Sequence, residues 1–262
     1  MKPLSFNQPP VVPAVENKKS LAEEFTEKEI KNGLAIPEKN ITIGDNIKLD
    51  TLNSSETSGF PFTFKKEILT ADLSLLQQES GSLNNIGSIF LCFGEEIKGN
   101  KLLFIASRLL KKQKDGFGLD LECQIEIFCK KHGINFIYNK ASSRDKKNGA
   151  YVWARYGYEF ADERQIESLR TSFYYFALKK GVIIIPFLEN LKRPIDFALA
   201  KGVPKEGGEK VDIGKIFLLS NNSEWHGKRD LTPGSQGTKD FIAYLKERGR
   251  EDLIDKYYAD EK

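Results

Sequence analysis

The apolar pattern of the chain changes abruptly between residues 110 and 121, and this change constrains the fold more than any other feature. Residues 102 to 110 form an apolar run in which Arg108 is the exception. After a turn that contains two glycines, apolar residues step by four and three positions, the spacing of one helix face. A strand that passes through a glycine turn into an amphipathic helix predicts a mixed α/β fold. The residues on this helix face are Leu121, Ile125, Phe128 and His132.

The segment before the turn has the two-residue alternation that is typical of antiparallel strands. A hairpin-like pair of short strands is predicted between residues 41 and 49, and another strand where Phe60, Phe62 and Phe64 alternate. Residues 86 to 93 and 102 to 110 predict two further strands, and the Gly-Asn pair between them favours a hairpin turn. We therefore expect residues 41 to 110 to form an antiparallel meander.

The segment after the turn alternates short strands with helices. A strand is predicted over residues 134 to 138, then a helix over 149 to 156 that Gly157 ends, then extended chain over 158 to 160. A helix over residues 162 to 179 follows. Beyond it lie a candidate strand over 182 to 188, which contains a proline, and a last amphipathic helix with Phe241, Ile242 and Leu245.

Three parts of the chain are expected to differ in organisation. Residues 1–18 contain four prolines and no usable period, which predicts a flexible N-terminal arm. Residues 19–160 are expected to form the core, beginning with a helix that Ser20 and Glu23 cap and Gly33 stops. Residues 161–262 are expected to form a C-terminal extension packed on that core.

Composition excludes several classes of protein. The net charge of +3 is too small to indicate nucleic-acid binding by itself, because such binding requires a concentrated basic face. Three widely spaced cysteines make no disulfide framework, and two distant histidines lack the spacing of a zinc site. The N-terminus lacks the apolar stretch of a secretory signal, and no apolar run approaches the length of a membrane helix. We therefore expect a cytoplasmic protein with no metal, no membrane partner and no nucleic-acid partner.

The glycine turn has the physical properties of a phosphate site. Glycine lets the backbone approach a ligand closely, and the amides of a following helix N-terminus carry partial positive charge. Many strand-to-helix turns contain glycine for steric reasons alone, so the pattern is compatible with a turn that binds nothing. The turn consists of Gln113, Lys114, Asp115, Gly116, Phe117 and Gly118.

This turn resembles the acetyl-CoA signature of the GNAT acyltransferase superfamily, in which Arg or Gln and two residues precede Gly, one residue, and Gly or Ala. The next segments resemble the family too: a strand, a loop that contains Asn148, and a short helix that ends at Gly157-Tyr158. The resemblance covers residues 86 to 160 well and residues 41 to 79 loosely. It implies a central, mainly antiparallel sheet with one parallel pair at the cofactor slot, flanked by helices and followed here by the C-terminal extension.

By this resemblance, acetyl-CoA is the co-substrate. Backbone amides of residues 114 to 119 would hold its pyrophosphate, and the strand over 102 to 110 would run beside the pantetheine arm, splayed from the next strand. The expected cofactor-binding residues are Leu110, Lys111, Gln113, Lys114, Asp115, Gly116, Phe117, Gly118, Leu119 and Asn148.

The chemistry that the family resemblance implies is direct transfer of the acetyl group to an amine, with a base for the amine proton and an acid for the thiolate. The acid is usually a tyrosine four residues before the glycine, where this chain has Trp153. Tyr156 is the nearest tyrosine on the same side of the helix and is the expected acid. Glu96, beside Glu95, is the expected base. Glu224 and His226 form a second polar cluster, either lining a substrate cleft or structural.

Two other functions fit the sequence. Because tryptophan cannot act as an acid, a GNAT-like fold without catalysis, kept as a binding or interaction module, is one alternative. The other is an unrelated α+β domain whose glycine turn binds another phosphate ligand or none. The acceptor amine, small molecule or protein, and the oligomeric state cannot be read from the sequence.

Overall fold

A computed structural model of the chain describes residues 20–44, 47–53, 67–79, 82–95, 100–110, 116–143, 149–220 and 223–259. The predicted N-terminal arm and the predicted strand with Phe60, Phe62 and Phe64 lie outside these residues.

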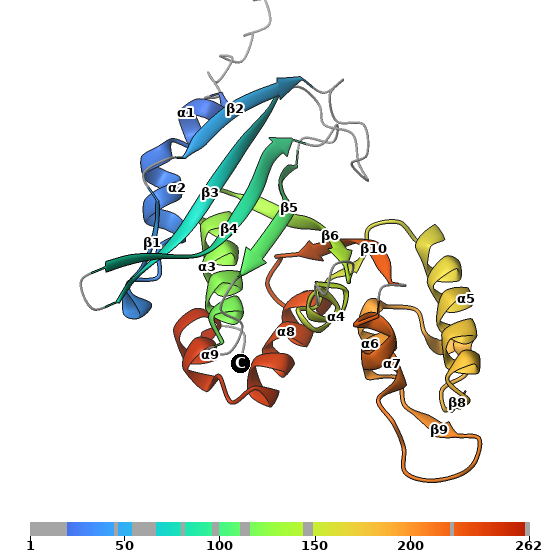
Figure 1. Ribbon diagram of the computed structural model, residues 1–262. Coiled ribbons are helices and arrows are strands. Elements are labelled where there is room, and N and C mark those ends of the chain that lie inside the picture. The colour runs from blue at the N-terminus through green and yellow to red at the C-terminus, as the bar shows by residue number, and fades with distance from the viewer. Residues whose placement is uncertain are drawn as a thin grey trace, which may run out of the picture.

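The centre of the fold is a twisted eight-stranded sheet with the order β1-β3-β4-β5-β6-β10-β7, in which β2 also pairs with β3 (Figure 1). Every strand pair is antiparallel except β5 with β6. The predicted mixed α/β class, with a mainly antiparallel sheet flanked by helices, is confirmed. The strands are β1 (Ile41–Ile43), β2 (Lys48–Asn53), β3 (Glu67–Glu79), β4 (Ser82–Glu95), β5 (Lys101–Leu110), β6 (Ile134–Ser142), β7 (Glu159–Phe160) and β10 (Glu224–Asp230).

The first two strands differ from the sequence prediction. The meander of β3, β4 and β5 is present, but β1 and β2 each pair with β3 and not with one another, so the predicted hairpin between residues 41 and 49 is wrong. The reason is the length of β3. Its 13 residues are enough for Ile41 to pair opposite Gln77 at one end and for Lys48 to pair opposite Asp72 nearer the other.

Helices cover one face of the sheet. The sequence predicts one helix at the start of the core, but the structure has two. Ser20 with Glu23 and Thr26 with Glu29 form separate capping boxes, and each capping box begins its own helix. Phe25, between the two, turns into the core and stacks on Phe93. The helices on this face are α1 (Leu21–Glu24), α2 (Glu27–Leu34), α3 (Phe117–Lys131), α4 (Gly149–Arg155), α8 (Gln236–Glu247) and α9 (Glu251–Tyr257).

A lobe of helices is inserted between β7 and β10 (Figure 1). Buried rings hold it together and join it to the sheet, because Phe197 lies against both Phe173 in the lobe and Phe160 in β7. The candidate strand over residues 182 to 188 is confirmed only for its first three residues. The lobe consists of α5 (Arg164–Lys179), β8 (Val182–Ile184), the 3-10 turn η4 (Leu188–Asn190), α6 (Pro194–Leu199), β9 (Gly202–Pro204) and α7 (Ile213–Leu218).

After the lobe the chain returns to the sheet. Strand β10 pairs along the length of β6 on one side and with β7 on the other. Residues that the sequence analysis assigned to an extension therefore complete the central sheet. Within the described parts of the chain, no helix combines the length and the apolar character needed to cross a membrane.

The ring cluster around Phe25 makes the attachment of α1 and α2 to the sheet testable. The Phe25 ring centroid lies 4.6 Å from that of Phe93 and 5.1 Å from that of His132, and the residue is 1% exposed. We expect Phe25→Ala to lower the free energy of unfolding by about 3–5 kcal/mol, since it removes a buried ring and leaves a cavity. Phe187→Ala is the matched control: Phe187 is 73% exposed, and its loss should change stability by less than about 0.5 kcal/mol. Equal shifts of the two denaturant midpoints would contradict this account of the core.

Candidate ligand-binding site

The two parallel strands separate part-way along their length. Strands β5 and β6 pair from Lys101 opposite Ile134 as far as Ile105 opposite Asn139. Beyond that point β5 stays with β4 up to Leu110, whereas β6 stays with β10 up to Ser142 (Figure 1). The last five residues of β5 therefore have no strand partner on their β6 side among the described residues. We call the opening between the two diverging strands the splay.

One extra residue in β5 marks the start of the splay. Phe90 of β4 lies opposite Ser107, but the next residue, Leu91, lies opposite Ile105, so Ala106 is a β-bulge. Because strand side chains alternate between faces, one inserted residue reverses the alternation beyond it. Ile105 faces the helices before the bulge, and Arg108 and Leu110 face them after it. The bulge thus turns the one charged side chain of this run toward α3.

Helix α3 is the next element after β5 and begins at Phe117. Gly116 is its N-cap, in the left-handed conformation with φ of +67°. The first helical bonds run from the amides of Leu119 and Asp120 to the Gly116 carbonyl. By helix geometry, the amides of Phe117 and Gly118 have no acceptor within α3. These two amides are donors at the end of the splay.

Three predicted site residues meet at this turn. A Cβ at Gly118 would lie 3.2 Å from the Tyr156 hydroxyl and 3.7 Å from Leu110 Cδ1, so glycine leaves room for both neighbours. Phe117 and Leu119 are buried beside them. The other expected residues lie outside the described part of the chain. These are Glu96, Lys111, Gln113, Lys114, Asp115 and Asn148.

Two basic side chains reach the same turn from distant parts of the sequence. Arg250, the N-cap of α9, binds the carboxylate of Asp120 with an Nη2–Oδ1 distance of 2.8 Å, and Lys39 binds the same carboxylate. The Nη1 atom of Arg250 lies 2.9 Å from the position a Gly116 Cβ would take. Neither residue could be predicted from the sequence, because no spacing along the chain links Lys39 or Arg250 to the turn.

Tyr156 is buried among aromatic rings. Its ring lies 5.8 Å from that of Trp153 and 5.2 Å from that of Phe241. Burial raises the pKa of the Tyr156 hydroxyl well above its ordinary value, so it stays protonated near neutral pH. It is a hydrogen-bond donor and a weak acid.

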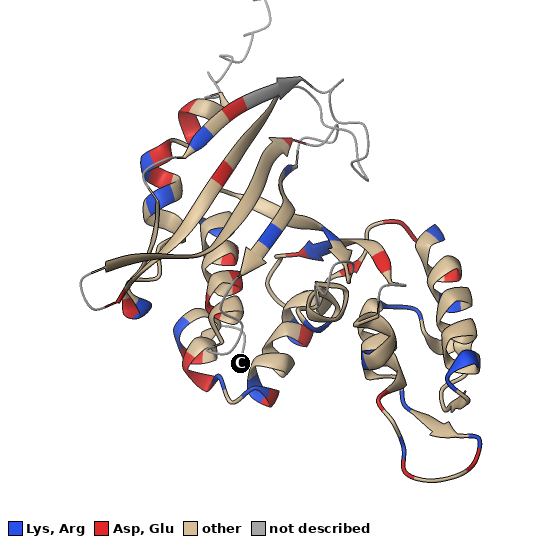
Figure 2. Ribbon diagram, in the orientation of Figure 1, with Lys and Arg blue, Asp and Glu red and all other residues tan. Residues whose placement is uncertain are grey.

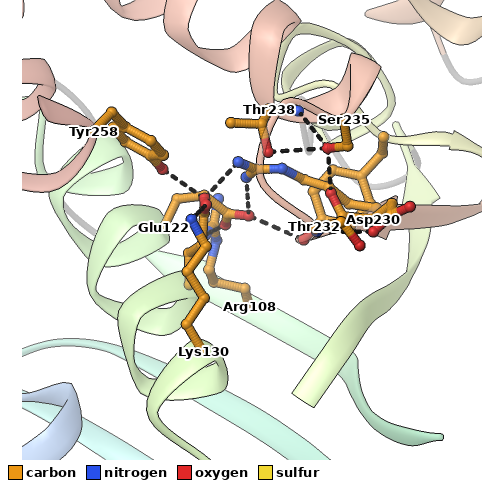
Figure 3. A network of polar contacts seen from close by, with 11 residues as sticks. Arg108, Glu122, Lys130, Asp230, Thr232, Ser235, Thr238 and Tyr258 are labelled. Atoms are coloured by element: carbon orange, nitrogen blue, oxygen red, sulfur yellow. Dashed lines mark hydrogen bonds and ion pairs between the residues drawn. The ribbon is translucent and has the colours of Figure 1, made fainter. Parts of the chain in front are cut away.

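A buried network of charges fixes α3 beneath the splay (Figure 3). Glu122 accepts hydrogen bonds from Arg108 at 2.9 Å and from the Tyr158 hydroxyl at 2.9 Å, and Arg229 lies between Glu122 and Glu126. Burial by itself would lower the pKa of Arg229, but the nearby Glu126, and less strongly Glu122, raise it above the ordinary value. Tyr258 and Lys130 complete the network at Glu126. Charged groups on α3, β5 and β10 are thereby locked to one another.

The second polar cluster lies on the other face of the sheet. Trp225 of β10 packs into the helix-covered core, so its neighbours Glu224 and His226 point to the opposite side. Glu224 pairs with Lys140 at 3.0 Å, and burial, with the charge of Lys140, lowers the pKa of His226. Strand β6 lies between β10, which carries Glu224 and His226, and β5.

Within the described residues, neither a cluster of like charges nor a set of metal ligands marks another site. Figure 2 shows acidic and basic residues interspersed on the helices, with no continuous face of one sign in that view. No group of three or more His, Cys, Asp or Glu side chains that could hold a metal occurs in the described residues. All three cysteines are buried, and burial raises the pKa of the Cys92 thiol to about 12.

Comparison of the chain with protein-family models and with curated proteins gives no match. The candidate site therefore rests on the geometry of the splay, the start of α3 and the network beneath them.

The buried network predicts which charged side chain the stability of the protein depends on. Arg229 is fully buried, and Arg229→Met would leave Glu126 and Glu122 with fewer partners inside the protein. We expect a loss of about 3–5 kcal/mol in the free energy of unfolding, measured by denaturant titration. Arg164→Met is the control. Arg164 pairs with Asp162 at the surface, where its side chain is 90% exposed, and its replacement should leave the midpoint unchanged within error. A tolerated Arg229→Met would show that the network does not hold α3.

Proposed function

We propose that this protein binds acetyl-CoA in the splay and transfers its acetyl group to an amine. The observation that carries the proposal is that two parallel strands separate directly before a left-handed glycine turn opens a helix. This arrangement supports the proposal, because the GNAT resemblance implies a cofactor slot between the strand over residues 102 to 110 and the next strand, and these two strands pair in parallel.

The described residues fit such a ligand in two respects. The amides of Phe117 and Gly118 at the positive end of α3 suit the pyrophosphate. Among the described residues, the edge of β5 beyond Ile105 has no strand partner on its β6 side. This edge suits the two amides of the pantetheine arm, because unpaired strand edges hydrogen-bond extended ligands. The lysines and Gln113 before the turn would add to the phosphate site, and Asn148 to the slot.

The reaction requires two proton transfers. The attacking amine loses a proton, for which Glu96 is the proposed base, and the sulfur of CoA gains one, for which Tyr156 is the proposed donor. The Tyr156 hydroxyl lies against Gly118 in the first turn of α3 and is protonated. The acceptor is proposed only as an amine, on a small molecule or a protein.

A catalytically inactive binding module is the second candidate. Two observations favour it: tryptophan occupies position 153, and the inserted lobe exposes large apolar side chains that suit a protein partner. Phe187 is 73% exposed and Tyr175 is 63% exposed. Turnover separates the two candidates. Acetyl-CoA binding without release of CoA thiol toward any of a panel of small amines and lysine peptides would favour the module.

Calorimetric titration with acetyl-CoA tests the proposed function directly. We expect the parent protein to bind and Gly116→Glu to lose about a hundredfold or more in affinity, because the new carboxylate faces the phosphates and crowds Arg250. Gly133→Glu is the matched control. Gly133 ends the same helix with φ of +66° and has open space around it, so this variant has equal backbone strain and should bind like the parent. Absence of binding by the folded parent would exclude the acyltransferase.

A further inference from the structure

The guanidinium of Arg108 is a buried cation whose hydrogen-bonding capacity is largely unused. Its side chain is 7% exposed, and its one hydrogen bond within the described residues runs from Nη1 to Glu122. A guanidinium has five N–H donors. Glu122 also accepts from Arg229 and Tyr158, so Arg108 has no carboxylate to itself. A buried charge with spare donors and a shared counter-ion is suited to a further anionic partner.

The position of Arg108 indicates where that partner would lie. Arg108 is three residues beyond Ile105, about 10 Å along β5 from the last pairing with β6, and therefore within the splay. The bulge at Ala106 turns the side chain toward the helices. There its Cζ lies 4.2 Å from the centroid of the Trp153 ring, which holds the guanidinium plane in place. The cation is thus fixed beside the slot and not free to move into solvent.

The proposed reaction creates an anion in the same slot. The amine nitrogen forms a bond to the carbonyl carbon, the carbon–sulfur bond breaks, and its electron pair goes to sulfur as a thiolate. The amine proton goes to the base, and the thiolate takes up a proton before CoA leaves. Tyr156 is a poor donor at the moment of bond breaking, because burial raises its pKa far above that of a thiol, which is about 8.5. The charge on sulfur therefore requires a cation nearby.

We propose that Arg108 binds the thiolate of CoA, with the guanidinium N–H groups that Glu122 leaves unused. The inference rests on the proposed function and deepens it. It assigns the stabilisation of the leaving group to a strand residue beneath the slot. Trp153 and Glu122 act as positioning residues, the first by stacking on the guanidinium and the second by fixing one of its nitrogens.

Binding of CoA compared with desulfo-CoA tests the proposal without any turnover. Desulfo-CoA has the phosphates and the pantetheine arm but no thiol, so its affinity reports the remainder of the site. If Arg108 binds the thiolate, the bound thiol has a lowered pKa. The affinity ratio of CoA to desulfo-CoA should then rise with pH and level off above the pKa of the free thiol. A lowering by one unit gives a roughly tenfold rise between about pH 6 and about pH 9.5.

Two substitutions at Arg108 and a matched arginine make the test specific. Arg108→Gln should bind desulfo-CoA about as well as the parent, and its affinity ratio should not change with pH. Arg108→Lys keeps the charge and should keep part of the rise. Arg155→Gln is the control: Arg155 is also 7% exposed, but it pairs with Glu247 and lies over the Tyr244 ring. It should behave like the parent.

Each outcome bears on one proposal. A parent whose affinity ratio does not change with pH, or a rise that persists in Arg108→Gln, overturns the role of Arg108 and leaves acetyl-CoA binding intact. Failure of the parent to bind either compound overturns the proposed function itself. Because the parent alone can give the first result, the test holds even where Arg108→Gln does not fold.

Discussion

The structure depends on the parallel pairing of β5 with β6 and on the point at which it stops. Five residues of each strand are held side by side, and the single inserted residue Ala106 then changes the direction and facing of β5. Had the pairing continued, the backbone edge of β5 would be satisfied by β6 and no slot would exist. Without the bulge, Arg108 and Leu110 would face away from α3. Two features follow from this local geometry: a β5 edge that has no strand partner beyond Ile105 among the described residues, and a buried cation.

The buried charges around α3 are the second determinant of the site. Helix α3 carries two glutamates on its buried side. Their partners come from β5, from β10 and from the segment between α4 and β7, all of which lie outside α3 in the sequence. Such a network is costly to bury and contributes little net stability, yet breaking one member is strongly destabilising. It therefore fixes where the start of α3 lies relative to the splay, which is what a phosphate site and a slot for the attached arm need.

The inserted lobe and the candidate site are built from different elements of the fold. Its aromatic core joins the sheet through Phe160, so it is part of the same hydrophobic core and not a tethered appendage. Its outer surface exposes large apolar side chains, while the splay and the buried network are built by the sheet, α3, α4 and the C-terminal helices. The exposed apolar side chains of the lobe suit a protein partner in the binding-module candidate, and the splay is the proposed cofactor site.

The sequence by itself determined the class of fold, the order of strands and helices between residues 86 and 179, and the glycine turn at the head of α3, because these follow from local periodicity and from backbone freedom at glycine. It also exposed Arg108 as the one charge in an apolar run, without indicating its partner. Only the tertiary structure decided that β1 and β2 share β3, that β10 lies between β6 and β7, and that Arg229, Lys39 and Arg250 surround α3. Those arrangements depend on contacts between residues far apart along the chain, and neither strand register nor the pairing of buried charges leaves a periodic trace in the sequence.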